Sequence, residues 1–128
     1  MNNLKRVSFL LFLLGFVATL VGCNSGKLKA MPAELKGTWK TSAKKFKGFT
    51  FEISDTHLTF NDQNAKPPTE EYPISKITKD KKKQNVYTIY YKSKDSQEYK
   101  FSFYFDPSGG GSIRLKNQRK YVWKKVKE

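Results

Sequence analysis

Hydrophobic and polar residues alternate along most of the chain after residue 36, in short segments separated by turn residues. In the clearest run, residues 98–105, every second position is aromatic: Tyr99, Phe101, Phe103 and Phe105. Because successive side chains of a strand point to opposite faces of a sheet, this run predicts a half-buried β-strand. No segment after residue 36 keeps a helical period, so the pattern is typical of an all-β domain.

The same alternation predicts eight strands, over residues 37–41, 49–53, 56–61, 72–77, 86–92, 98–105, 112–116 and 119–126. Short connections rich in Asp, Asn, Gly and Pro favour antiparallel neighbours. We predict a small eight-stranded antiparallel up-and-down barrel, since closure removes exposed edges; a β sandwich or half-open barrel is the alternative. We also expect a helical turn at 32–35, and an edge or short strand around Pro73, which has no N–H to donate.

The first 22 residues read as an export signal, with Lys5 and Arg6 before an uncharged apolar stretch at 7–20. That stretch is shorter than the roughly 20 residues of a membrane-spanning helix. The motif Leu20-Val21-Gly22-Cys23 resembles the lipobox of bacterial lipoproteins: an apolar residue, a tolerant position, a small residue and the modified cysteine. The resemblance implies cleavage between Gly22 and Cys23 and a diacylglyceryl group on the Cys23 thiol.

The expected organisation follows from that motif. Residues 1–22 form the signal peptide, 23–35 the lipidated N-terminus and a flexible tether, and 36–128 the barrel domain. We expect the mature protein to be a monomer, exported and lipid-anchored to the outer face of the cell membrane, or to an envelope membrane if there are two.

The chain is strongly basic, with 25 Lys and Arg against 11 Asp and Glu. Removing Lys5 and Arg6 with the leader leaves 23 against 11, a balance of +12. The 25 basic residues of the full chain are 22 Lys and 3 Arg, and Lys lacks the planar fork suited to nucleotide recognition. We therefore expect an anionic envelope polymer or lipid, and not nucleic acid, as the electrostatic partner. The candidate basic patch comprises Lys79, Lys81, Lys82 and Lys83, although such a run is also typical of a solvated hairpin tip.

Catalytic and metal chemistry has little support in the sequence. His57 is the only histidine, and Asp55 lies near it, but no nucleophile motif accompanies them. One histidine and one cysteine, itself expected to carry lipid, are too few for a zinc or transition-metal cluster. We expect no enzymatic activity, no metal and no cofactor.

The predicted strands, the helical turn and the motif Gly37-Thr38-Trp39 together resemble the lipocalins and the wider calycin group. The resemblance implies that Trp39 packs across the closed barrel end against a basic residue of the last strand, Arg119 or less readily Arg114. The segment Arg119-Lys120-Tyr121 is similar to the Arg-X-Tyr pair with which fatty-acid carriers of that group hold a carboxylate. It implies a ligand site formed by Arg114, Arg119 and Tyr121.

Two functions remain open from the sequence. The first is a lipocalin-like domain that holds a small amphiphilic ligand inside the barrel. The second is an interaction, immunity or inhibitor-type lipoprotein that binds an anionic envelope polymer, a peptide or a protein through its basic, tyrosine-bearing surface. A roomy cavity would favour the first function, and an interior filled by aromatic side chains would favour the second.

Overall fold

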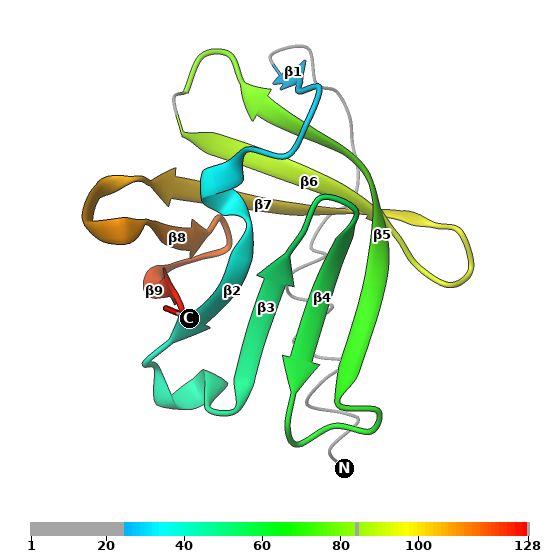
Figure 1. Cartoon of the computed structure of the whole chain (residues 1–128), viewed down its shortest axis with the longest axis vertical. Helices are drawn as coiled ribbons and strands as arrows, with labels where there is room; N and C mark the ends of the chain where they lie inside the picture. The colour runs from blue at the N-terminus through cyan, green and yellow to red at the C-terminus, as the bar shows by residue number, and fades with distance from the viewer. Residues whose placement is uncertain (1–24, 84, 128) are drawn as a thin grey trace.

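The computed structural model describes residues 25–83 and 85–127, which form a closed eight-stranded antiparallel β-barrel with one further strand outside it (Figure 1). Hydrogen bonding joins the strands in the order β1-β5-β4-β3-β2-β9-β8-β7-β6, and the pairing of β5 with β6 closes the barrel. The predicted barrel is confirmed, and the alternatives of a sandwich or a half-open barrel are wrong. The strands are β1 (Ser25–Lys27), β2 (Gly37–Thr41), β3 (Phe49–Ile53), β4 (His57–Asp62), β5 (Thr69–Asp80), β6 (Val86–Lys92), β7 (Glu98–Asp106), β8 (Ser112–Leu115) and β9 (Gln118–Lys125).

Strand β5 differs from the prediction. It is 12 residues long and lies within the barrel, so the expectation that Pro73 marks an edge or a short strand is wrong. Residues 69–73 of β5 pair with β4, whereas residues 74–79 pair with β6. Pro73 is the last β5 residue in register with β4, and a register shift follows between Ile74 and Lys76. The missing N–H therefore falls where the strand changes partners, and it is tolerated there.

The segment expected to be a flexible tether is docked on the barrel from residue 25 onward; residues 23 and 24 lie outside the described residues. Strand β1 pairs with Thr78–Asp80 of β5, and the Leu28 N–H donates to the Ile77 carbonyl over 2.9 Å. The physical reason is that β4 begins at His57, opposite Pro73, so β5 beyond Pro73 has backbone groups that β4 does not pair and that β1 can satisfy.

Short 3-10 helices lie at the two ends of the barrel. The expected helical turn is η1 (Ala33–Leu35), beside the start of β2, and η2 (Lys44–Phe46) follows the end of β2. Because β2 runs from one barrel end to the other, η1 and η2 lie at opposite ends (Figure 1). In the described part of the chain, no helix is both long enough and apolar enough to span a membrane.

The barrel interior is filled by large side chains. Rings from facing strands contact one another, with Phe51 at 5.0 Å from Trp123 and 5.1 Å from Phe101 between centroids. Such pairs each contribute about 0.5–1.5 kcal/mol beyond the area they bury. The bulkiest fully buried side chains come from η1, which supplies Leu35, and from every barrel strand except β5: Trp39, Trp123, Tyr91, Phe51, Phe60, Phe101, Phe103, Ile53, Leu58, Ile89 and Ile113.

Candidate functional site

The outward side of β5 to β9 carries cations and tyrosines. In β7 the inward Phe101, Phe103 and Phe105 leave Lys100, Ser102 and Tyr104 on the outside, and Thr88 and Tyr90 of β6 lie next to them. Thr88 and Ser102 join their hydroxyls across the two strands at 2.9 Å. We define the basic outer face as the exposed or half-buried side chains Lys76, Tyr90, Lys100, Tyr104, Arg114, Lys116 and Arg119.

The two tyrosines of the basic outer face are each packed against cations. Lys76 Nζ lies 4.5 Å from the centroid of the Tyr90 ring, and Lys100 Nζ lies 5.5 Å from the same centroid. Arg119 Cζ lies 5.1 Å from the Tyr104 ring centroid, while Arg114 Nη1 donates to the Arg119 carbonyl over 2.9 Å. Cation–π contacts at exposed sites contribute about 0.5–1 kcal/mol each, so these contacts restrain the cations without neutralising them.

The carboxylates of Asp80 and Asp106 lie near cations of the basic outer face but accept hydrogen bonds from residues two or three positions along the chain. Asp80 accepts the N–H groups of Lys83 and Lys82, and these hydrogen bonds hold the pKa of Asp80 below its usual range. Asp106 accepts the Ser108 N–H and hydroxyl, which lowers its pKa in the same way. Within residues 25–83 and 85–127, no carboxylate forms an ion pair within 4.0 Å with any cation of this face. Asp80 and Asp106 interact electrostatically with Lys116 and Arg114 at longer range, so the positive charge around Tyr90 and Tyr104 is the part most available to an external anion.

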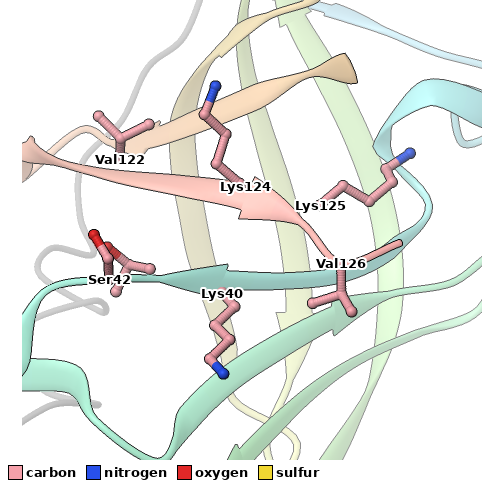
Figure 2. A pocket seen from close by; sticks show the side chains of 7 residues that line it. Lys40, Ser42, Val122, Lys124, Lys125 and Val126 are labelled. Atoms are coloured by element: carbon pink, nitrogen blue, oxygen red, sulfur yellow. The ribbon is translucent and has the colours of Figure 1, made fainter. Parts of the chain in front are cut away.

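A second lysine-lined surface lies where β2 meets β9. Lys40 and Lys124 are register partners, and Figure 2 shows their ammonium groups diverging from the seam between the two strands. Val122 and Val126 line the same groove, whose volume is about 410 Å³. Val126 is 41 % exposed, and a single exposed apolar side chain of this kind is ordinary on a protein surface.

The predicted basic patch lies at the connection between β5 and β6. Lys81, Lys82 and Lys83 are exposed, while Lys79 is half-buried with its Nζ 5.5 Å from the Tyr87 ring centroid. The structure brings these lysines together at one barrel end, in the hairpin connection that the sequence also favoured.

The predicted barrel-closing pair of Trp39 and Arg119 is wrong, because another basic residue packs against Trp39. Trp39 is fully buried and donates its Nε1–H to the Leu35 carbonyl over 3.1 Å. The cation above its ring is Lys125 of β9, with Nζ 5.4 Å from the centroid and 2.8 Å from the Glu34 carbonyl that it donates to. Arg119 instead lies over Tyr104 on the outer face.

The predicted ligand site is not assembled. Arg114 and Arg119 are exposed on the outer face, and Tyr121 packs on Phe46 of η2 with 5.1 Å between ring centroids. The reason is an irregularity between β8 and β9, where the register passes from Ile113 opposite Trp123 to Leu115 opposite Gln118. Extra residues in β9 change which side chains point inward, and no spacing in the sequence marks this shift. Lys125 is the register partner of Trp39 in the separate pairing of β2 with β9.

Three buried polar atoms have no hydrogen-bond partner within the described part of the chain: Tyr91 Oη, Gln118 Oε1 and Trp123 Nε1. Burial raises the pKa of the Tyr91 hydroxyl, with the neighbouring Tyr72 and Tyr99 as smaller causes. Tyr91 lies one residue from the end of β6, and Gln118 begins β9, so both lie toward the η2 end of the barrel. Sequence reasoning gave no role to Tyr91 or Gln118, because burial of their polar atoms depends on barrel closure.

His57 and Asp55 do not form an acid–base pair. His57 Nδ1 lies 2.8 Å from the Thr56 hydroxyl, and Asp55 pairs with Lys36 over 3.1 Å. Across residues 25–83 and 85–127, no cluster of three or more His, Cys, Asp or Glu side chains is arranged to hold a metal ion.

Comparison of the chain with protein families, with characterised proteins and with solved structures gives no match. The class of protein is therefore defined by the fold: a closed eight-stranded antiparallel barrel, filled by aromatic side chains and basic on its outer side.

Proposed function

We propose that this protein is an exported lipoprotein, anchored at Cys23, whose barrel binds a polyanion of the cell envelope through the basic outer face. The proposal rests mainly on the array of cations around Tyr90 and Tyr104 that have no carboxylate partner in the described part of the chain. The filled interior supports an outward contact over a ligand enclosed by the barrel.

A flexible polyanion suits this surface in two ways. Ammonium and guanidinium groups come from β5, β7, β8 and β9, with β6 and its Tyr90 between β5 and β7, so an extended chain of charges can contact several at once. The Tyr90 and Tyr104 rings supply apolar contact with a hydrogen-bonding hydroxyl at the rim. Lysines act as point charges, which favours binding by charge density over recognition of one defined group.

The binding experiment uses the chain from Asn24 onward and long-chain inorganic polyphosphate as the probe. The variant Lys76→Gln/Lys100→Gln removes both cations from Tyr90. Each exposed charge contributes about 0.2–1 kcal/mol, so we expect affinity to fall roughly 2- to 30-fold and the salt dependence to weaken. The control is Lys44→Gln/Lys47→Gln, with the same charge change at exposed positions near η2.

Equal losses in the two variants would contradict a defined site, because net charge alone would then explain binding. Poly-L-glutamate serves as a second probe. A preference for polyglutamate over polyphosphate would point to an acidic protein segment in place of an envelope polymer.

The anchor is tested separately in bacterial cells. When the full sequence is expressed, we expect the protein in the membrane fraction to have the mass of a chain that is cleaved before Cys23 and acylated there. The variant Cys23→Ser removes the thiol that would accept the diacylglyceryl group, so it should carry no lipid and leave that fraction. Unmodified Cys23 in the wild-type protein would refute the anchor.

A second candidate function, binding of a small amphiphile toward the η2 end, is supported by the unpaired polar atoms of Tyr91 and Gln118, which lie at strand ends there. A polar ligand group near them would remove the cost of burying them unpaired. Native mass spectrometry of the chain from Asn24 onward tests this function. One amphiphile per chain, lost on delipidation and in Tyr91→Phe/Gln118→Leu, would favour it; a clean mass with no uptake of added fatty acid would exclude it.

A further inference from the structure

The connection between β5 and β6 carries a dense set of lysines next to the N-terminal strand. We define the basic tip as Lys27 of β1 together with Lys79, Lys81, Lys82 and Lys83. Ser25 is in register with Asp80 and Gly26 with Lys79, so β1 lies along the strand that leads into the tip (Figure 1). A Cβ on Gly26 would lie 3.4 Å from Lys81 Cε, which shows that the Lys81 side chain lies over the β1 backbone.

The tip has a defined backbone. The Asp80 carboxylate accepts the N–H of Lys82 over 2.8 Å and the N–H of Lys83 over 3.1 Å. Asp80 is the one carboxylate in the segment 79–83, and these hydrogen bonds occupy one of its oxygens. Lys81, Lys82 and Lys83 are all exposed.

Cys23 precedes Ser25 by two residues, and two residues of chain span at most about 7 Å. A lipid on Cys23 would thus place the bilayer surface within roughly one Debye length of the basic tip at physiological salt. Because the β1 backbone is hydrogen-bonded to β5, a lipid on Cys23 would also hold this end of the barrel close to the bilayer.

We infer that the basic tip is a membrane-contact surface that binds anionic phospholipid headgroups and orients the anchored barrel. This inference rests on the proposed anchor at Cys23. In the resulting orientation the β1 end of the barrel faces the bilayer, while η2 and the opposite barrel end point away from it. The basic outer face runs along the side of the barrel and stays accessible to an envelope polymer.

The test uses the lipid-free chain from Asn24 onward, which contains all barrel strands and all the core side chains named above. Vesicles of phosphatidylglycerol are compared with vesicles of phosphatidylcholine by co-sedimentation. We expect binding to the phosphatidylglycerol vesicles that weakens as salt is raised. The variant Lys81→Gln/Lys82→Gln/Lys83→Gln should lower the partition coefficient on the order of 100-fold, since each lysine near an anionic surface adds about fivefold.

The matched control is Lys44→Gln/Lys47→Gln/Lys94→Gln, which removes the same charge from exposed lysines at the far barrel end. We expect it to retain binding within about tenfold of the wild-type protein. Equal losses in the two variants, or no binding of the wild-type chain to phosphatidylglycerol, would overturn the inference.

Failure of this inference and failure of the anchor are distinguishable. Lipid on Cys23 without tip-dependent vesicle binding would refute the inference and leave the anchor standing. Absence of lipid on Cys23 would refute the anchor and the orientation derived from it, whatever the vesicles show.

Discussion

Replacing Tyr91 with Phe removes one buried oxygen and leaves the ring contacts in place. Tyr91 is 2 % exposed, and its ring lies 5.3 Å from Tyr72, 6.0 Å from Tyr99 and 6.1 Å from Phe60 between centroids. The hydroxyl has no hydrogen-bond partner in the described part of the chain. A buried unpaired group costs about 1–3 kcal/mol, so we expect Tyr91→Phe to raise the free energy of unfolding by about 1 kcal/mol.

The same substitution should change the alkaline stability. Burial raises the pKa of Tyr91 above its ordinary value of 10.0, so the folded protein keeps the proton at a pH where the unfolded chain loses it. The stability linked to this proton is therefore fully present below about pH 10 and is lost as pH rises above that value. Phe cannot ionise, so the advantage of Tyr91→Phe should be larger at pH 11 than at pH 8.

Urea unfolding followed by tryptophan fluorescence at pH 8 and pH 11 measures both effects, because Trp39 and Trp123 are fully buried. The control is Tyr99→Phe, which removes a hydroxyl that donates to Gln97 Oε1 over 2.8 Å. Tyr99→Phe should lower the free energy of unfolding by at most about 0.5–1.5 kcal/mol. A loss of 1 kcal/mol or more in Tyr91→Phe at pH 8 would refute the reasoning and show that this hydroxyl is hydrogen-bonded in solution.

Gly111→Ala should destabilise the fold by about 2 kcal/mol in urea unfolding, since Gly111 has φ +99° and a Cβ there would lie 3.3 Å from the Phe105 ring. Gly110 has φ +86° and no atom within 4 Å of an added Cβ, so Gly110→Ala should lose less stability than Gly111→Ala. Equal losses in the two variants would contradict the packing argument. Lys125→Met keeps most of the stem but loses the contact with Trp39 and the bond to Glu34, so we expect a loss of about 1 kcal/mol. An unchanged urea midpoint would show that the ammonium group contributes nothing. The lowered pKa of Asp80 adds stability above about pH 3.8 that is lost as pH falls below it, so Asp80→Asn should lose less stability than wild type between pH 5 and pH 2; parallel pH profiles would contradict this linkage.

The strand pattern was predictable because each barrel strand has one face in the core. Residues 49–53 and 86–92 were predicted with the bounds that the structure shows, since apolar and polar side chains alternate through both segments. The prediction was less accurate for β5, where only Ile77 among its apolar residues is fully buried. Thr78 is also buried, beside β1 and β6, so polarity alone did not indicate the length of this strand.

Side-chain direction in β9 was the main error, and it affected the candidate site. The spacing in Arg119-Lys120-Tyr121 suggested an inward arginine, but the register shift between β8 and β9 turned Arg119 onto the outer face. A shift of one residue moves a strand's side chains to the opposite face, and local sequence carries no record of the partner strand's register. The lysine that covers Trp39 was missed because the pairing of β2 with β9, which places Lys125 opposite Trp39, is not written in either strand alone.

The sequence by itself determined the all-β class, the number of barrel strands, the positive charge and the motif at Cys23, because these depend on residue type and local spacing. Only the tertiary structure decided that the interior is filled, that the cations gather around Tyr90 and Tyr104, and that Gly26 lies beside Lys81. Each of these features joins residues that lie apart in the sequence. Their positions follow from closure of the barrel and from strand register, which are set by all strands packing together.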